Sequence, residues 1–257
     1  MDLINRLLFF FVIIGTSLNF HAIAKNIASF DFHLLAIEEC LLPEDHPLYE
    51  SLKDLFQDPK MFKSRKFLLQ AGFHVSKRMH RDLMVASHPA LKGYLIKKFR
   101  DNISLKDQLE NYCQRINGAR VLKEFIQLNQ LQQIVVPQKW LYLLPSHFAD
   151  ATTGENAYLL IVEKMPIDTA KKKIARKYQV IDRQTLKELC LVLYFFRGLD
   201  STLLNMPFTS QNQIAFIDTE KWAEERHVPF LHQVMPYLNR KSQRSVLEVF
   251  DRLSQKH

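Results

Sequence analysis

Three polar residues in the last third of the chain, Asp200, Asn205 and Asp218, have the types and the spacing that phosphoryl transfer requires. The Asn follows the first Asp by five positions, and the second Asp closes an apolar stretch thirteen positions later. In phosphoryl transfer one carboxylate orients or deprotonates the attacking hydroxyl, while an amide and a second carboxylate hold the metal ion on the phosphates. The set therefore predicts a phosphotransferase site. Coincidence is the alternative, because Asp and Asn also occur in turns, where their side chains bond their own backbone.

The segments around these residues occur in an order that would position them. An apolar run at residues 186–196 predicts a helix ahead of Asp200, and residues 214–217 predict a strand that ends at Asp218. A turn that contains Pro207 separates the two segments. Helix, loop, turn and strand in this order favour the chemical interpretation over coincidence.

This arrangement resembles the catalytic end of the protein-kinase-like superfamily, and in particular its short aminoglycoside- and choline-kinase-like branch. That branch has the pattern Asp-x4-Asn followed by Ile-Asp-x-Glu, which the chain matches from Asp200 to Glu220. The resemblance implies an α+β, two-lobed protein-kinase-like fold, with an antiparallel sheet in the N-lobe and a short helical C-lobe. It also implies ATP and Mg²⁺ as cofactors, with Asp200 as the catalytic residue and Asn205 and Asp218 as the metal ligands.

Short apolar segments upstream predict the strands of the N-lobe. Residues 73–77 alternate as a half-buried strand does, and residues 83–86 form a second apolar strand. Residues 134–137 and 139–143 together predict a fourth strand region, and residues 158–162 predict a fully apolar strand. Turns are expected at residues 88–93 and 151–156.

Lys97 and Glu124 are the predicted ion pair of the N-lobe. Residues 94–97 resemble the Val-Ala-Ile-Lys strand of kinases, which implies that Lys97 neutralises nucleotide phosphates, while Lys98 should point to the opposite face. After Gly118 a periodic segment at residues 119–131 predicts a helix with Glu124 on its inward face, beside Val121, Leu128 and Leu131. A solvated edge-strand lysine and a surface glutamate are the alternatives.

Glu163 and Met165 follow the apolar strand at the position of the kinase hinge. The resemblance implies that the backbone of this segment bonds the adenine edge of the nucleotide. Beyond it, residues 170–178 predict a basic helix, residues 183–196 an apolar helix, and the spacing of Val246, Val249 and Leu253 a last one. The sequence contains no Ala-Pro-Glu triplet after Asp218, which favours a small-molecule kinase over a protein kinase.

The remaining sequence gives four expected segments. Residues 1–24 resemble a secretory signal peptide, with Arg6, an apolar stretch and Ala22-Ile-Ala24 at the cleavage position. An uncleaved anchor and a buried first helix remain alternatives. Residues 25–71 form an extension with helices expected at 34–42 and 47–56, residues 72–165 the N-lobe, and residues 166–257 the reduced helical C-lobe.

The charge and the cysteine content give weaker evidence about function than the motifs do. The net charge of +8 favours acidic ligands, and its densest cluster is at residues 171–177, where a solvated helix face is the alternative. No specific nucleic-acid motif accompanies it. Three widely spaced cysteines imply no disulfide framework, and Cys190 is expected in the core.

Two hypotheses from different classes therefore remain open. The first is an exported phosphotransferase that acts on a small molecule or a host component, with a nucleotide and an unknown phosphoryl acceptor as partners. The second is a catalytically silent kinase-like protein that binds a protein partner or ligand at the same site. Retention of the three polar residues favours the first. The lack of a glycine-rich loop near residues 76–81 and the leader, which directs the chain to compartments poor in ATP, favour the second.

Overall fold

The computed structural model of the chain describes residues 36–58, 60–62, 65–76, 83–99, 103–150, 155–222 and 231–254. The leader expected at residues 1–24 lies outside this part of the chain. The same holds for residues 77–82, where kinases have their glycine-rich loop, and for residues 151–154 of the turn expected before the apolar strand.

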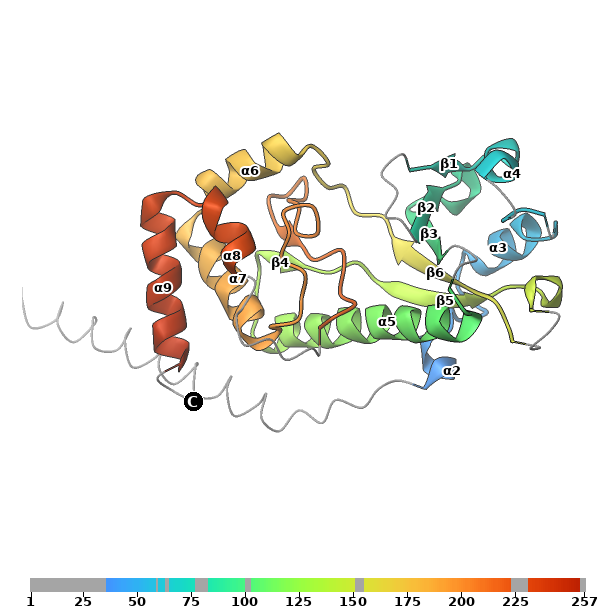
Figure 1. Cartoon of the computed structure of the whole chain (residues 1–257), viewed down its shortest axis with the longest axis horizontal. Coiled ribbons are helices and arrows are strands. Elements are labelled where there is room, and N and C mark those ends of the chain that lie inside the picture. The colour runs from blue at the N-terminus through green and yellow to red at the C-terminus, as the bar shows by residue number, and fades with distance from the viewer. Residues whose placement is uncertain are drawn as a thin grey trace, which may run out of the picture. The chain divides into compact units, whose positions relative to one another are not determined.

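A five-stranded antiparallel sheet forms the first half of the fold (Figure 1). Its strand order is β1 (His74–Val75), β2 (Leu83–Ser87), β3 (Tyr94–Phe99), β6 (Tyr158–Glu163) and β5 (Lys139–Leu143). Lys97 of β3 is paired with Val85 of β2 and Leu160 of β6. The antiparallel sheet expected within residues 72–165 is therefore confirmed.

Residues 159–162 of strand β6 are all apolar because both faces of the sheet are covered. Leu159 and Ile161 are fully buried in one core cluster, and Leu160 and Val162 lie in a second cluster on the other face. A strand that is covered on two sides does not need the alternation of a half-exposed one.

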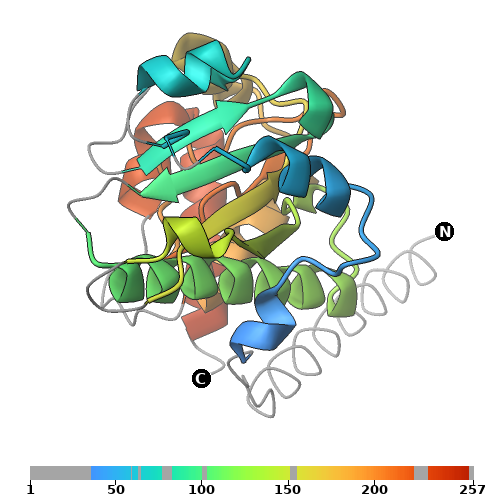
Figure 2. The same ribbon diagram turned by 90° about the vertical axis from the view of Figure 1, so that its right-hand side faces the viewer.

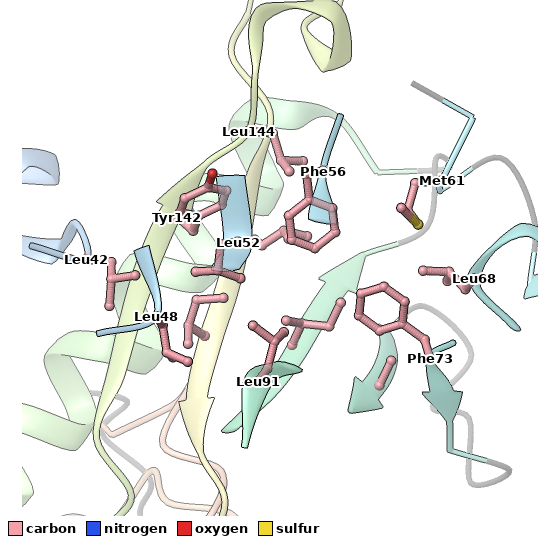
Figure 3. Packing of buried hydrophobic residues seen from close by; sticks show 14 of the residues in the cluster. Leu42, Leu48, Leu52, Phe56, Met61, Leu68, Phe73, Leu91, Tyr142 and Leu144 are labelled. Carbon is pink, nitrogen blue, oxygen red and sulfur yellow. The ribbon is translucent and has the colours of Figure 1, made fainter. Parts of the chain in front are cut away.

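The first cluster lies between the sheet and the segments that precede it (Figure 3). These segments contain α2 (Ile37–Cys40), α3 (Tyr49–Leu55) and α4 (Arg65–Gln70), and the sequence analysis did not foresee α4. Leu52 and Phe56 from α3 and its end are fully buried and pack with Phe73 and Tyr142. The extension thus covers one face of the sheet.

The second cluster lies between the sheet and the long helix α5 (Leu105–Leu128), which runs beside β5 and β6 (Figure 2). Ser104 caps its start by accepting a hydrogen bond from the backbone N–H of Asp107 at 3.1 Å. The expectation that a separate helix begins after Gly118 was wrong, since α5 continues through this glycine.

The region expected as a fourth strand is divided between two sheets. Residues 139–143 form β5 of the main sheet, whereas β4 (Ile134–Val135) pairs in parallel with β7 (Ile214–Ala215). Strand β7 of this small second sheet lies just before Asp218 in the sequence. In the part of the chain that the structure describes, three 3₁₀ turns complete the connections: η1 (Pro89–Leu91), η2 (Ser146–Phe148) and η3 (Met235–Tyr237).

The last third of the chain is helical, as expected. It contains α6 (Lys171–Gln179), α7 (Arg183–Phe195), α8 (Leu231–Val234) and α9 (Arg240–Ser254), and α7 packs against α9. Asp182 caps α7, and Cys190 within it is fully buried, as predicted. Within the described residues, no helix has the length and apolar character needed to cross a membrane.

Candidate active site

The loop after α7 holds Asp200 and Asn205 in direct contact. One carboxylate oxygen of Asp200 accepts a hydrogen bond from the backbone N–H of Thr202 at 3.0 Å, and the other accepts one from Asn205 Nδ2 at 2.8 Å. The Thr202 carbonyl in turn accepts from the backbone N–H of Asn205 at 2.9 Å. These local bonds orient the Asn205 amide so that its nitrogen donates to the Asp200 carboxylate.

Backbone bonds bring the strand that ends at Asp218 beside this loop. The N–H of Ile217 donates to the carbonyl of Asn205 at 3.0 Å, and the N–H of Ala215 donates to the carbonyl of Pro207 at 2.8 Å. Asp218 therefore directly follows a residue bonded to Asn205. The structure thus brings Asp200, Asn205 and Asp218 into one region.

Arg115 of α5 binds Asp218 and Glu220 together. Its Nη1 lies 2.6 Å from Asp218 Oδ1, and its Nη2 contacts Glu220 Oε2. The arginine side chain is only 6% exposed, so little water competes for its two carboxylate partners. Burial alone would raise the pKa of Asp218, but Arg115, Lys97 and Lys139 outweigh it and lower this pKa to about 2. Asp218 is therefore ionised at neutral pH.

Two lysines of the sheet face the same loop. Lys97 and Lys139 are paired with Leu160 and Val162, so both lie on the face that α5 covers. Lys139 Nζ donates to Thr219 Oγ1 at 2.6 Å, and Thr219 Oγ1 donates to the carbonyl of Arg115 at 2.7 Å. Lys98 lies on the opposite face, as predicted, with its ammonium 5.5 Å from the centre of the Phe62 ring.

The surroundings change the pKa of both lysines. Burial lowers the pKa of Lys97 to about 8, the charge of Arg115 acts in the same direction, and Asp218 and Glu220 oppose it. Burial also lowers the pKa of Lys139 well below its usual value, with a further contribution from Lys97. Lys97 is therefore only partly charged near pH 8.

The predicted pair of Lys97 and Glu124 is not formed within the described residues. The carboxylate of Glu124 lies 3.2 Å from Arg120, one turn earlier on the same helix. The inward face had been assigned from Val121, Leu128 and Leu131. Val121 is buried, but Leu128 is 53% exposed at the end of α5. The residue of α5 that reaches the site is Arg115, about 13 Å before Glu124 along the helix axis.

A sequence signal for Arg115 existed but was missed. Arg115 shares one helical face with four buried residues: Tyr112, Ile116, Ala119 and Leu122. A charged residue inside such a stripe has to find a buried partner.

Gly118 allows α5 to approach the Asp218 loop closely. A Cβ atom at this position would lie 2.2 Å from the carbonyl oxygen of Thr219 and 2.5 Å from the Trp222 ring. Only a residue without a side chain fits this contact. The glycine that had suggested a break in the helix is therefore a packing residue of the site.

The predicted hinge residues lie where the sheet leads into the helical region. Glu163 is exposed and is bonded to Gln138, because its carboxylate accepts from the Gln138 N–H at 3.1 Å and its N–H donates to the Gln138 carbonyl at 2.9 Å. Met165 is half-buried and precedes Pro166, whose carbonyl accepts from the N–H of Ser210 at 2.9 Å. Their contact with a nucleotide stays a prediction.

The donor set at the site fits Mg²⁺ through Asn205 and Asp218. The Asn205 amide uses its nitrogen on Asp200, and Asp218 uses Oδ1 on Arg115, so among the described residues Asn205 Oδ1 and Asp218 Oδ2 have no protein partner. Such oxygens are the ligands that Mg²⁺ prefers. The described residues contain no cluster of three or more His, Cys, Asp or Glu side chains that could hold a metal.

Comparison with known proteins gives similarity only at the level of structure. No protein-family model and no curated protein sequence matches the chain. Among solved structures, the bifunctional kinase-methyltransferase WbdD is 14% identical with a TM-score of 0.36, and the match covers 68% of this chain and 43% of that one. A MAP kinase from Leishmania major is 15% identical with a TM-score of 0.32, and the match covers 63% of this chain and 50% of that one.

The chain spans about half the length of the two kinases that it matches. At these TM-scores no residue role is transferred from them. The order of the chain's own elements is that of a protein-kinase-like fold: an antiparallel sheet with a helix between its third and fourth strands in sequence, followed by a helical region that contains the Asp200 loop.

Proposed function

We propose that this chain is a kinase-like phosphotransferase that uses ATP and Mg²⁺. One observation supports this most directly: two segments of the chain bring Asp200, Asn205 and Asp218 together by the side-chain bond of Asn205 to Asp200 and the backbone bond of Ile217 to Asn205. The three residue types are those that phosphoryl transfer uses.

Each residue has a separate task in this proposal. Asp200 orients the acceptor hydroxyl and accepts its proton, and Asn205 holds Asp200 in place through its amide nitrogen. Asn205 Oδ1 and Asp218 Oδ2 would hold the Mg²⁺ ion, which neutralises the charge of the phosphates when it is bound. Lys97 lies on the sheet face that α5 covers, its charge acts on Asp218, and in this proposal it contributes a positive charge toward the phosphates.

Arg115 keeps Asp218 oriented in this scheme. A guanidinium group binds carboxylates in a fixed fork geometry, and here its two nitrogens divide between Asp218 and Glu220. Only one oxygen of Asp218 is used, so the second oxygen stays available as a ligand.

Arg115 also supports the second hypothesis, a catalytically silent kinase-like protein that binds a ligand or protein partner at this site. A guanidinium at 2.6 Å already compensates the Asp218 charge that a metal ion would compensate in an active kinase. In that case phosphate groups would be bound by Lys97 without a metal, and Asp200 would have no catalytic task.

The acceptor and the location of the protein are parts of the proposal. A hydroxyl on a small molecule or a host component fits Asp200, and the leader at residues 1–24 would export the chain. Asp168, which precedes α6, lies 2.6 and 2.9 Å from Lys173 and Lys177 of this helix. The other basic residues of α6 are exposed and could attract an acidic ligand: Lys171, Lys172 and Arg176.

Thermal unfolding of the purified chain with a non-hydrolysable ATP analogue tests the two functions. An active site predicts an increase in melting temperature of about 5–10 °C at saturating nucleotide with Mg²⁺ and much less with a chelator. Asp218→Ala should remove the Mg²⁺ dependence, whereas Asp200→Ala should retain it. Glu110→Ala, an exposed carboxylate on α5, is the control. Equal stabilisation of both site variants with and without Mg²⁺ would favour the silent protein. No stabilisation by the nucleotide would exclude the phosphotransferase and leave only a protein that binds another ligand or a protein partner.

A further inference from the structure

Cys40 is fixed at the edge of the main sheet. It ends α2, and the next residue, Leu41, forms a parallel bridge with Leu141 of β5. The N–H of Leu42 then donates to the carbonyl of Leu141 at 2.7 Å. Cys40 itself is 1% exposed. Its position is therefore defined by backbone bonds to β5.

Cys113 reaches the same place from α5. This helix packs against both β5 and α2, and Cys113 packs on the core cluster that contains Cys40, Leu141 and Leu160. Each thiol also changes the pKa of the other, which agrees with this packing. Cys113 is partly exposed, so one thiol of the pair is accessible from solvent.

We propose that Cys40 and Cys113 form a disulfide when the folded chain meets a thiol-disulfide oxidant. The proposal assigns a modification site to residues that the phosphotransferase proposal does not use, and it stands independently of that function. If the leader exports the chain, it delivers the pair to a compartment in which such oxidants are present.

The reaction is a double thiol-disulfide exchange. The thiolate of Cys113 attacks one sulfur of the oxidant's disulfide, which forms a mixed disulfide and releases the first oxidant thiol. Cys40 then attacks the Cys113 sulfur and releases the second oxidant thiol, and the two protons lost by the cysteines pass to the released thiolates. Two cysteine thiols are oxidised and one oxidant disulfide is reduced.

The order of attack follows from the environment of each thiol. The neighbouring Cys40 thiol lowers the pKa of Cys113, although burial opposes it, whereas the Cys113 thiol and burial both raise the pKa of Cys40. Because the thiolate is the attacking species, the accessible Cys113 is the first nucleophile.

The cross-link would tie the segment before the sheet to the helix that carries Arg115, two residues after Cys113. It closes a loop of roughly 70 residues, which limits the unfolded chain strongly. We expect oxidation to raise the melting temperature by about 5–10 °C.

Counting free thiols in the full chain tests the proposal. The native protein is incubated with glutathione disulfide, quenched with N-ethylmaleimide under denaturing conditions and analysed by intact mass and peptide mapping. The expected product has one remaining alkylated cysteine, Cys190, and a peptide that links Cys40 to Cys113. Cys190→Ser should form the same link and show the same rise in melting temperature.

Two further variants make the outcome decisive. Cys113→Ser and Cys40→Ser should form no internal link, and Cys113→Ser, a change at a partly exposed position, should melt at the same temperature with or without oxidant. Three free thiols in the native chain, under conditions that oxidise a reference dithiol, would overturn the proposal. So would a link that contains Cys190.

Discussion

The two loops of the candidate site are built in different ways. The Asp200 loop is local, because Asp200, Thr202 and Asn205 bond one another within six residues of sequence. The Asp218 loop depends on distant segments: Arg115 and Gly118 from α5, and Lys139 from β5. The first loop holds Asp200 and Asn205 in contact, and the second places a buried arginine on Asp218.

The two loops therefore have different tasks: the Asp200 loop would orient the catalytic groups, and the Asp218 loop holds the parts of the site together. The local loop orients the groups that would act on the acceptor hydroxyl by side-chain hydrogen bonds within the loop itself. The Asp218 loop joins sheet, helix α5 and the helical region, since Lys139, Thr219 and Arg115 form one chain of hydrogen bonds. Changes in the first loop should affect turnover, and changes around the second should affect binding and stability.

The largest effect should come from Asp200 in the local loop. If the chain is active, Asp200→Ala should lower the turnover number by about 10²–10⁴-fold, because the acceptor hydroxyl loses its base and orienting group. Nucleotide binding, measured by calorimetry, should change little, because Asp200 bonds the amide nitrogen of Asn205 and not the amide oxygen that would hold the metal ion. A variant that loses nucleotide affinity in proportion to turnover would show that the two loops do not have separate tasks.

Gly118→Ala should break the contact between α5 and the Asp218 loop. Alanine favours helix by about 1 kcal/mol, but its Cβ would lie 2.2 Å from the Thr219 carbonyl oxygen. We expect a net loss of about 2–3 kcal/mol in the free energy of unfolding, measured with urea. Gln114→Ala, exposed on the same helix, should stay within about 0.5 kcal/mol of the unchanged chain. Equal stability of both variants would contradict the close packing.

The ionised Asp218 should contribute about 2 kcal/mol of pH-dependent stability. Its pKa falls from 3.8 to about 2 in the folded chain, so the contribution is present above about pH 4 and is lost as the pH decreases toward 2. The difference in unfolding free energy between the unchanged chain and Asp218→Asn should therefore shrink over this range. Asp54→Asn, at an exposed position, serves as the reference. A difference that does not vary with pH would contradict the proposed charge interactions.

Lys97 should give the smallest effect, a pH dependence of nucleotide affinity. Its pKa of about 8 means that the lysine loses its charge above this pH, so affinity for phosphates should fall by at most about tenfold per pH unit. Lys97→Arg keeps its charge and should show a flatter profile between pH 8 and 10. Parallel profiles of the two proteins would place the phosphates away from Lys97.

The same contrast explains how much the sequence predicted. The Asp200–Asn205 spacing and the strand at residues 158–162 were recognised because local pattern alone defines them. Arg115 and the role of Gly118 were missed because their partners lie about a hundred residues away. The fourth strand region was assigned to one sheet because apolar runs do not show which strand they pair with, and the proximity of Cys40 and Cys113 depends on packing in the same way.

The central claim is that Asn205 and Asp218 hold the metal ion on the nucleotide while Arg115 stays on Asp218. A crystal structure of the full chain with Mn²⁺ and a non-hydrolysable ATP analogue tests it directly through the anomalous signal of the metal. We predict one peak about 2.2 Å from both Asn205 Oδ1 and Asp218 Oδ2, with Arg115 retained on Asp218 Oδ1. Bound nucleotide without a metal peak at Asp218, or Arg115 bonded to both oxygens of this carboxylate, would contradict the claim.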